Sequence, residues 1–359
     1  MKARQLVNVV MRRYGMGSSH YSVSRIKPEE QLFFPSTKEA REASSTGTGE
    51  METISRMPAA PSLSLVRSAV LVERLDFLPF YERKILCVDA QGRTVLYDAD
   101  ADADAGLLHP LPSLRGPKGP NPISFSILDR EPLDPRRADV LYVMPRCPRR
   151  YDYYSFEALM YSDPSNGRKG WRWHRLPPPP ASANGCHALV DKDGGGDPIL
   201  VVSSADGTHC FHTFTNTWFE AGGWRLPFAG RAHRVAELDN LWFGIARAWP
   251  YDLCAMDLYP LCGGLCPEAE APRLAYSWGD HLSLPDDWEM MDCSMVYLGG
   301  GRFCVAKIFE FCHGDDDRKG MGVISGLEVV RQGEPSKLVM VKHKSKLYKF
   351  TRDEIQCIL

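Results

Sequence analysis

The sequence predicts an all-β protein, and more specifically a kelch-like β-propeller of five or six four-stranded blades with one short N-terminal helix. Two observations carry this prediction. Short runs rich in Val, Ile, Phe and Thr are separated by Asp-Gly, Gln-Gly or Asn turns, which is the signal of antiparallel hairpins. Leu-Pro pairs close successive groups of runs at positions 111, 176, 226 and 284, which is near the period of about 50 residues of kelch blades.

The clearest element is the stretch from Pro198 to Phe228. An apolar run at 199–202 meets the turn Ala205-Asp206-Gly207 and returns as residues 208–214, after which a second turn leads to Trp218. Two β-rich runs on either side of an Asp-Gly pair favour a hairpin. We therefore expect a three-stranded meander here.

The N-terminal region predicts a hairpin and a helix. The runs 6–11 and 21–26 are expected to pair with each other. Ser36 is followed three residues later by Glu39, which is a capping-box pattern and predicts a helix over 37–43. Residues 44–61 are rich in Ser, Thr, Gly and Pro, so we expect them to be flexible.

Five modules of about four runs each follow. The first has runs at 63–66, 69–80, 85–88 and 94–97, the second at 123–128, 140–144, 156–161 and 171–176, and the third adds 186–190 to the meander. The fourth has runs at 233–238, 241–246, 253–258 and 274–278, and the fifth at 295–298, 303–311, 323–330 and 338–350. The expected organisation is thus 1–35, strands that join the propeller closure; 36–61, the helix and flexible insertion; and 62–359, the propeller body. A sixth blade is expected only if the two termini share it.

Composition and charge exclude some classes of partner. The net charge of -2 gives no overall bias towards nucleic acid or an anionic membrane, and no run approaches the roughly 20 apolar residues of a membrane span. The eleven cysteines are scattered singly in apolar runs, as in a cytoplasmic or nuclear protein with reduced thiols. A mitochondrial transit peptide is the alternative, because several basic residues precede the first acidic one: Lys2, Arg4, Arg12 and Arg13.

Several segments together resemble a large plant family, expanded in grasses, described as domain of unknown function 1618 and as a relative of kelch-like β-propellers. They are LVNVVMRRYG, LFFPSTKEA, KILCVDAQGRTVLYDAD, LPSLRGPKGPNPISFSI, WRWHRLPPPP, WRLPFAGRA, GRFCVAKIFE and VKHKSK. The resemblance covers 6–359 and implies a fold without an activity, a cofactor or a catalytic residue. Many plant kelch proteins carry an N-terminal F-box that docks to a ubiquitin-ligase scaffold. Here one short helix is expected before residue 60, so neither an F-box nor such a scaffold is expected.

Possible metal ligands fail on spacing. His209 and His212 are three residues apart on a predicted strand and would face opposite sides of the sheet. Cys254, Cys262 and Cys266 supply one zinc-like spacing without a second. We therefore predict no metal site among them.

Two acidic loops do not match a metal-binding pattern, and the usual catalytic motifs are absent from the sequence. The loop 312–317 resembles a solvated acidic turn, and the calcium-like start at Asp191 has Val202 where an EF-hand has Glu. No phosphate loop, nucleophile elbow or copper-radical motif occurs in the sequence. We predict no enzyme and no cofactor.

Arginine and aromatic residues concentrate in the loops 145–154 and 166–173, and this composition is typical of interface hot spots. The partner-binding residues predicted from it are Arg146, Arg149, Arg150, Tyr151 and Trp171. A solvated loop is the alternative. The predicted function is a non-catalytic interaction module for an unidentified protein partner. Two alternatives stay open: a ligand or carbohydrate binder or enzyme whose channel site is assembled from several blades, and RNA contact through the arginine-tyrosine loop.

Overall fold

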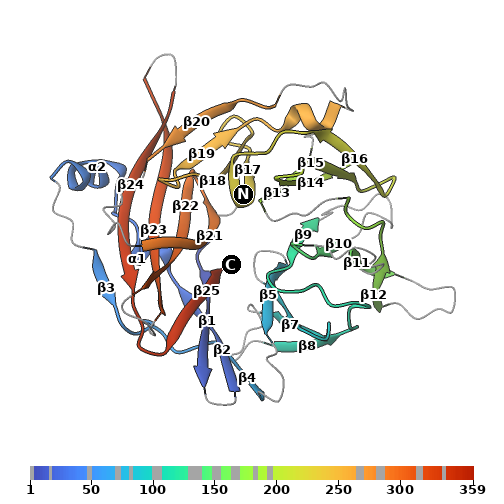
Figure 1. Ribbon diagram of the computed structural model, residues 1–359. Helices are drawn as coiled ribbons and strands as arrows, with labels where there is room; N and C mark the ends of the chain where they lie inside the picture. The colour runs from blue at the N-terminus through green and yellow to red at the C-terminus, as the bar shows by residue number, and fades with distance from the viewer. Residues whose placement is uncertain are drawn as a thin grey trace. The chain divides into compact units, whose positions relative to one another are not determined.

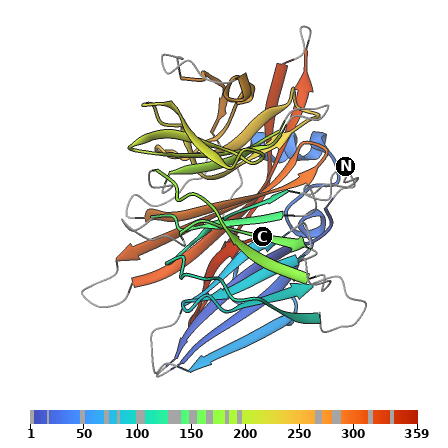
Figure 2. The ribbon, with the colours of Figure 1, turned by 90° about the vertical axis from the view of Figure 1, so that its right-hand side faces the viewer.

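The computed structural model describes residues 4–15, 18–46, 51–68, 74–80, 84–98, 107–127, 140–147, 155–162, 170–180, 185–191, 197–263, 271–279, 288–312, 318–333 and 337–359. Antiparallel strands dominate and helices are few, which confirms the all-β class (Figures 1 and 2). The chain forms two compact units. Unit 1 comprises Met1–Leu71, Ala229–Met256 and Leu274–Leu359, and unit 2 comprises Val72–Phe228 and Asp257–Arg273.

Unit 1 contains a sheet built from both ends of the chain. Its strands are bonded in the order β25 (Asp353–Ile358), β1 (Val7–Gly15), β2 (Ser18–Ile26) and β4 (Leu63–Ser68). The expected N-terminal hairpin is confirmed, and on its other side β1 pairs with β25, where Val9 lies opposite Ile358. The Arg13 guanidinium donates two hydrogen bonds to Asp353, at 2.8 and 2.7 Å. The run at 63–66 thus pairs with the N-terminal hairpin and not with the module that follows it in sequence.

A second sheet of unit 1 comes mostly from the C-terminal region. Its order is β21 (Trp288–Gly299), β22 (Arg302–Cys312), β23 (Arg318–Gln332), β24 (Lys337–Tyr348) and the parallel β3 (Glu52–Ile54). β3 lies in the segment predicted to be flexible, and these three residues form a strand that the sequence did not predict. The open edge of β24 at Lys346–Tyr348 gives their backbone groups hydrogen-bonding partners.

The third group of strands in unit 1 follows the fourth predicted module. Its order is β17 (Phe228–Val235), β18 (Leu241–Ala246), β19 (Leu253–Met256) and β20 (Leu274–Trp278). Apolar side chains of this group pack against those of β21–β24, including Phe243 on Phe303, whose ring centroids are 5.2 Å apart. Burial of each such side chain contributes about 1.5–3 kcal/mol.

The helical segment of unit 1 lies beside β24 (Figure 1). It contains α1 (Pro28–Gln31), which the sequence did not predict, and α2 (Thr37–Thr46), which confirms the predicted helix. The Ser36 half of the capping box is present, because Ser36 Oγ accepts the Glu39 N–H at 3.2 Å, and the same hydroxyl donates to the Glu39 carboxylate at 2.9 Å. Among the described residues, no helix has the length and apolarity that crossing a membrane requires.

His343 of β24 fastens this helical segment to the sheet. Its Nδ1 accepts the Phe34 N–H at 3.1 Å, so the ring proton lies on Nε2, which is 3.2 Å from Glu328 Oε2. Glu328 also accepts hydrogen bonds from Thr37 Oγ1 at 2.8 Å and Arg302 Nε at 3.2 Å. Burial lowers the pKa of His343 although Glu328 raises it. The ring is therefore neutral at pH 7 and holds the helical segment through its unprotonated nitrogen.

Unit 2 contains three groups of four antiparallel strands. The first is β5 (Leu75–Phe80), β6 (Lys84–Asp89), β7 (Thr94–Asp98) and β8 (Leu107–Leu111). The second is β9 (Ile123–Ile127), β10 (Val140–Met144), β11 (Glu157–Ser162) and β12 (Gly170–Arg175). The third is β13 (Cys186–Val190), β14 (Ile199–Ser204), β15 (Gly207–His212) and β16 (Thr217–Gly222). A 3-10 helix spans Tyr259–Gly263. The β14–β16 meander and the β6–β7 hairpin confirm two predictions.

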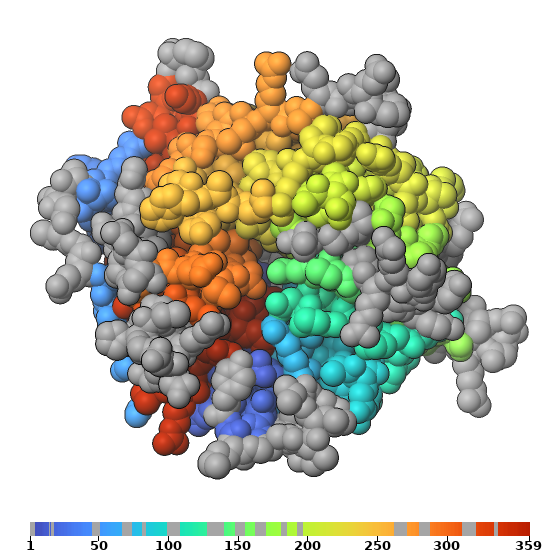
Figure 3. All heavy atoms as spheres, in the orientation of Figure 1, coloured from blue at the N-terminus to red at the C-terminus, as the bar shows by residue number. Residues whose placement is uncertain are grey.

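The middle group of unit 2 is buried on both faces. Along β10, Leu141 and Val143 pack with the β5–β8 group, whereas Tyr142 and Met144 pack with the β13–β16 group. Side chains alternate between the faces of a strand, so burial of both faces explains why β10 is a continuous apolar run. In the space-filling view, atoms of β5 (light blue) lie against those of β9 (blue-green), as their contacts require (Figure 3).

Candidate functional site

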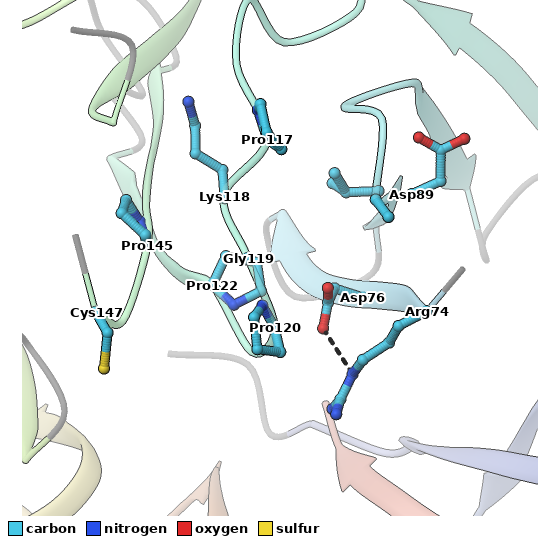
Figure 4. Close-up of a pocket in the computed structure, with 12 residues that line it drawn as sticks. Arg74, Asp76, Asp89, Pro117, Lys118, Gly119, Pro120, Pro122, Pro145 and Cys147 are labelled. Atoms are coloured by element: carbon cyan, nitrogen blue, oxygen red, sulfur yellow. Dashed lines mark hydrogen bonds and ion pairs between the residues drawn. The ribbon is translucent and has the colours of Figure 1, made fainter. Parts of the chain in front are cut away.

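The candidate site is a pocket of about 410 Å³ in unit 2. Four segments form it: the start of β5, the β6–β7 turn, the loop that joins β8 to β9, and the residues after β10 (Figure 4). It is lined by Arg74, Asp76, Val88, Asp89, Ala90, Pro117, Lys118, Gly119, Pro120, Pro122, Pro145 and Cys147.

The β8–β9 loop is anchored where it leaves β8. The Pro112 carbonyl accepts hydrogen bonds from Thr94 Oγ1 at 2.8 Å and from Trp173 Nε1 at 2.6 Å. Two residues later, the Leu114 N–H donates to the carbonyl of Gly92 at 2.8 Å. Gly92 has φ +81, and a Cβ there would lie 3.1 Å from the Leu114 Cβ, so this close approach requires glycine.

A buried ion pair fastens the middle of the loop. Lys118 Nζ lies 2.6 Å from Glu157 Oε2, with side chains 1% and 0% exposed. The Glu157 carboxylate also accepts the Arg115 N–H, at 3.2 Å to each oxygen. Both charges have lost their water, so they depend on each other for stabilisation.

A second cluster fixes the end of the loop. Asp76 Oδ1 accepts hydrogen bonds from Arg74 Nε at 3.2 Å and from the Asn121 N–H at 3.0 Å, and Arg74 Nη2 donates to the Asn121 side-chain oxygen. Asn121 has φ +52, a conformation that asparagine tolerates better than most residues. In Figure 4, the Arg74–Asp76 pair and Cys147 lie on opposite sides of residues 119–122.

The remaining carboxylate of the lining serves a turn. Asp89 accepts hydrogen bonds from the Gln91 and Arg93 N–H groups at 3.0 and 2.8 Å, and from Arg93 Nε at 2.6 Å. This arrangement holds the β6–β7 turn. Asp89 is therefore a structural acceptor.

The lining combines a rigid apolar wall with a few oriented polar groups. Four proline rings, Pro117, Pro120, Pro122 and Pro145, supply rigid apolar wall, and the described lining contains no histidine. A preformed pocket with a few oriented polar groups is typical of binding.

None of the predicted partner-binding residues is among the described residues that line this pocket. Arg146 is half-buried and lies in the chain between the lining residues Pro145 and Cys147. Trp171 is on β12, where it packs against Phe80 and Tyr161 with ring centroids 5.7 and 5.5 Å away. The strand register places Trp171 at the other end of the β9–β12 group from Arg146. Arg149, Arg150 and Tyr151 lie outside the described residues, so RNA contact through that loop stays a prediction.

The predicted absence of metal sites concerns residues that are only partly described. His212 Nδ1 accepts the Thr215 N–H at 3.4 Å, and His209 lies opposite Val202 on one side and Glu220 on the other. Within the described ranges, no three His, Cys, Asp or Glu side chains are placed to hold a metal ion. Cys266 and the loop residues 192–196 and 313–317 lie outside those ranges.

The described cysteines whose side chains are placed are free. Burial raises the pKa of Cys87 and Cys254 to about 12, so these thiols stay protonated at pH 7. They are inert core groups.

Sequence reasoning missed this pocket. The segment LPSLRGPKGPNP supported the family resemblance, yet its dense proline and glycine signal was not connected with a site. Prolines in a long connection indicate a stiff loop, and long ordered loops often carry function. The partners Asp76 and Glu157 are distant in sequence, so only the fold reveals them.

Comparison with family models places the chain. The model of the family described as "Protein of unknown function (DUF1668)" matches residues 4–348. This match covers nearly the whole chain, so the chain belongs to that family. It corrects the resemblance to domain of unknown function 1618. The comparison with curated proteins found no match.

Proposed function

We propose that this chain is a six-bladed β-propeller that acts as a non-catalytic interaction module, and that the proline-lined pocket binds its protein partner. The blade count is supported by the succession of four-stranded groups: β25 with β1, β2 and β4, then β5–β8, β9–β12, β13–β16, β17–β20 and β21–β24. In a β-propeller, a blade that combines strands from both termini would hold the ring of blades closed.

The observation that carries the binding role is the anchoring of the β8–β9 loop. Its backbone is bonded to β6–β7, to β12 and to the start of β5, and Lys118 is fixed by Glu157. A pocket wall held in this way loses little conformational entropy when a partner binds. Preorganisation of this kind favours recognition of a fixed shape.

The dimensions of the pocket favour a single anchoring side chain of the partner. About 410 Å³ is near the lower end of the usual range for ligand pockets, roughly 300–1,000 Å³. Proline rings would contact the apolar part of such an anchor. The half-buried Arg146, which lies in the chain between the lining residues Pro145 and Cys147, would stand at the rim and contact polar groups around the anchor, as arginine does at many interfaces.

Affinity purification with variant chains tests this proposal. Cys147→Trp places a bulky group in the pocket from an exposed position, and Arg146→Ala removes the rim cation. Both should lose a partner that the wild type retains. Arg172→Ala removes an exposed arginine of β12 elsewhere in unit 2 and should retain it.

Far-UV circular dichroism and Tm must first show that all three variants are folded like the wild type. Equal recovery of the partner by wild type and Cys147→Trp would overturn the pocket as the binding site. Failure of the wild type to retain any partner would overturn the interaction role.

A further inference from the structure

We propose that unit 1 contains a phosphate site formed by Arg231 and His233 of β17 together with Arg4 of the N-terminal segment. The site is independent of the pocket in unit 2 and would recognise a phosphate group that carries a hydroxyl, with inorganic hydrogen phosphate as the simplest ligand.

The backbone brings these three residues together. Arg231 and His233 are two residues apart on β17, so their side chains leave the same face of the strand. The start of β17 lies beside β21, where the Ala229 carbonyl is 3.9 Å from Cys293 Sγ and the His233 ring bonds to the Met295 backbone. The Arg4 N–H donates to the carbonyl of Leu298, also on β21, at 2.8 Å. The N-terminal segment and the β17 face thus meet over one strand.

Arg231 is the charged residue of this site that lacks a counter-ion among the described residues. Arg231 makes no hydrogen bond or ion pair with any described residue, and the charges that act on it and on His233 are those of arginines. Burial lowers the pKa of Arg231 to about 10, and burial together with Arg231 lowers the pKa of His233 to about 3. A half-buried guanidinium without an anion is costly. A bound anion would offset that cost.

His233 makes the site selective among oxyanions. Its Nε2 is buried and has no described hydrogen-bond partner, so the bond to the Met295 backbone belongs to Nδ1. The neutral ring therefore presents a bare acceptor at Nε2. Hydrogen phosphate can satisfy it by donating its hydroxyl, while its charged oxygens accept from the guanidinium groups. Sulfate and carboxylate ions carry no proton at pH 7 and leave Nε2 unsatisfied.

Calorimetric titration of the full chain with inorganic phosphate at pH 7.5 and constant ionic strength tests the site. Wild type should bind phosphate, and its Tm should rise with phosphate concentration. Sulfate should bind at least about tenfold more weakly, because one hydrogen bond to a charged ligand is lost. Methyl phosphate is almost fully deprotonated at pH 7.5 and then carries no hydroxyl, so it should bind as weakly as sulfate. This comparison separates free phosphate from a phosphate ester.

Arg231→Gln should abolish phosphate binding, and it should raise Tm in phosphate-free buffer because it removes an uncompensated charge. Arg247→Gln changes an exposed arginine of the same unit and should leave binding intact. A lowered Tm for folded Arg231→Gln with unchanged phosphate affinity would overturn the site. Equal affinity for phosphate and sulfate would overturn the role assigned to His233, and absence of binding by the wild type would overturn the proposal.

Discussion

The buried Lys118–Glu157 pair is the most consequential pair of charges at the pocket. Lys118→Met should lower the free energy of unfolding by about 3–5 kcal/mol, because it leaves the Glu157 carboxylate buried with the Arg115 N–H and without its cation. Urea denaturation of the purified chain measures this loss.

The double variant Lys118→Met/Glu157→Gln is the matched control. It removes both charges and should recover most of the lost stability. A single variant as stable as the wild type would show that the Glu157 carboxylate finds another partner.

His343 gives unit 1 a pH dependence of known sign. Its pKa is lowered on folding, so the unfolded chain takes up the proton more readily and stability falls as the pH drops below about 6.5. The other charged groups around it are Glu328, Arg302 and Glu29. Hydrogen bonds with Thr37, His343 and Arg302 lower the pKa of Glu328 despite its burial. Glu328 therefore adds a further loss of stability only below about pH 4.5.

His343→Gln isolates this contribution. Glutamine can accept the Phe34 N–H and donate to Glu328 without titrating, so the variant should lose less stability than the wild type between pH 7.5 and pH 5.5. Urea denaturation at several pH values provides the comparison. His233 is present in both chains. If the free energy of unfolding depended on pH equally in both, His343 would not titrate in this range.

At the scale of elements, the β8–β9 loop depends on the hairpin beside it. Gly92→Ala forces a Cβ onto a residue with φ +81, 3.1 Å from the Leu114 Cβ. We expect a loss of roughly 1–2 kcal/mol and faster amide exchange in residues 112–122. Hydrogen exchange with mass spectrometry detects the second effect. Unchanged protection in this loop would show that its other anchors suffice.

Local signals in the sequence predicted local elements well. The capping box at Ser36 predicted α2, and the Gln91-Gly92 and Asp206-Gly207 turns predicted two hairpins, because each signal acts over a few residues. Pairings between distant segments were missed. β4 pairs with β2 across the helical segment, and β3 joins β24, because strand edges choose partners by position in the fold.

The same limit applies to the candidate sites. The arginine and aromatic content of two loops predicted Arg146, which is a neighbour in the chain of two lining residues, and also Trp171, which packs within unit 2. Composition cannot tell an aromatic side chain that contacts a partner from one that contacts a neighbouring sheet. Arg4 and Arg231 belong to segments far apart in sequence, so their proximity follows only from the arrangement of unit 1.

At the scale of the whole molecule, membership in the DUF1668 family covers residues of both units. The family match therefore does not separate them into independent modules. Unit 2 is formed almost entirely by one continuous stretch, Val72–Phe228, whereas unit 1 combines three separated stretches.

The pairing of β1 with β25 has a consequence for protein synthesis. Arg13 and Asp353 are 340 residues apart, so β1 leaves the ribosome long before its partner exists. At about 5–20 residues per second, that strand waits on the order of tens of seconds with one edge exposed. Unit 2, whose main stretch is translated in between, can fold during this interval. Completion of unit 1 thus has to wait until β25 has been synthesised, and until then the exposed edge of β1 is a place where nascent chains can aggregate.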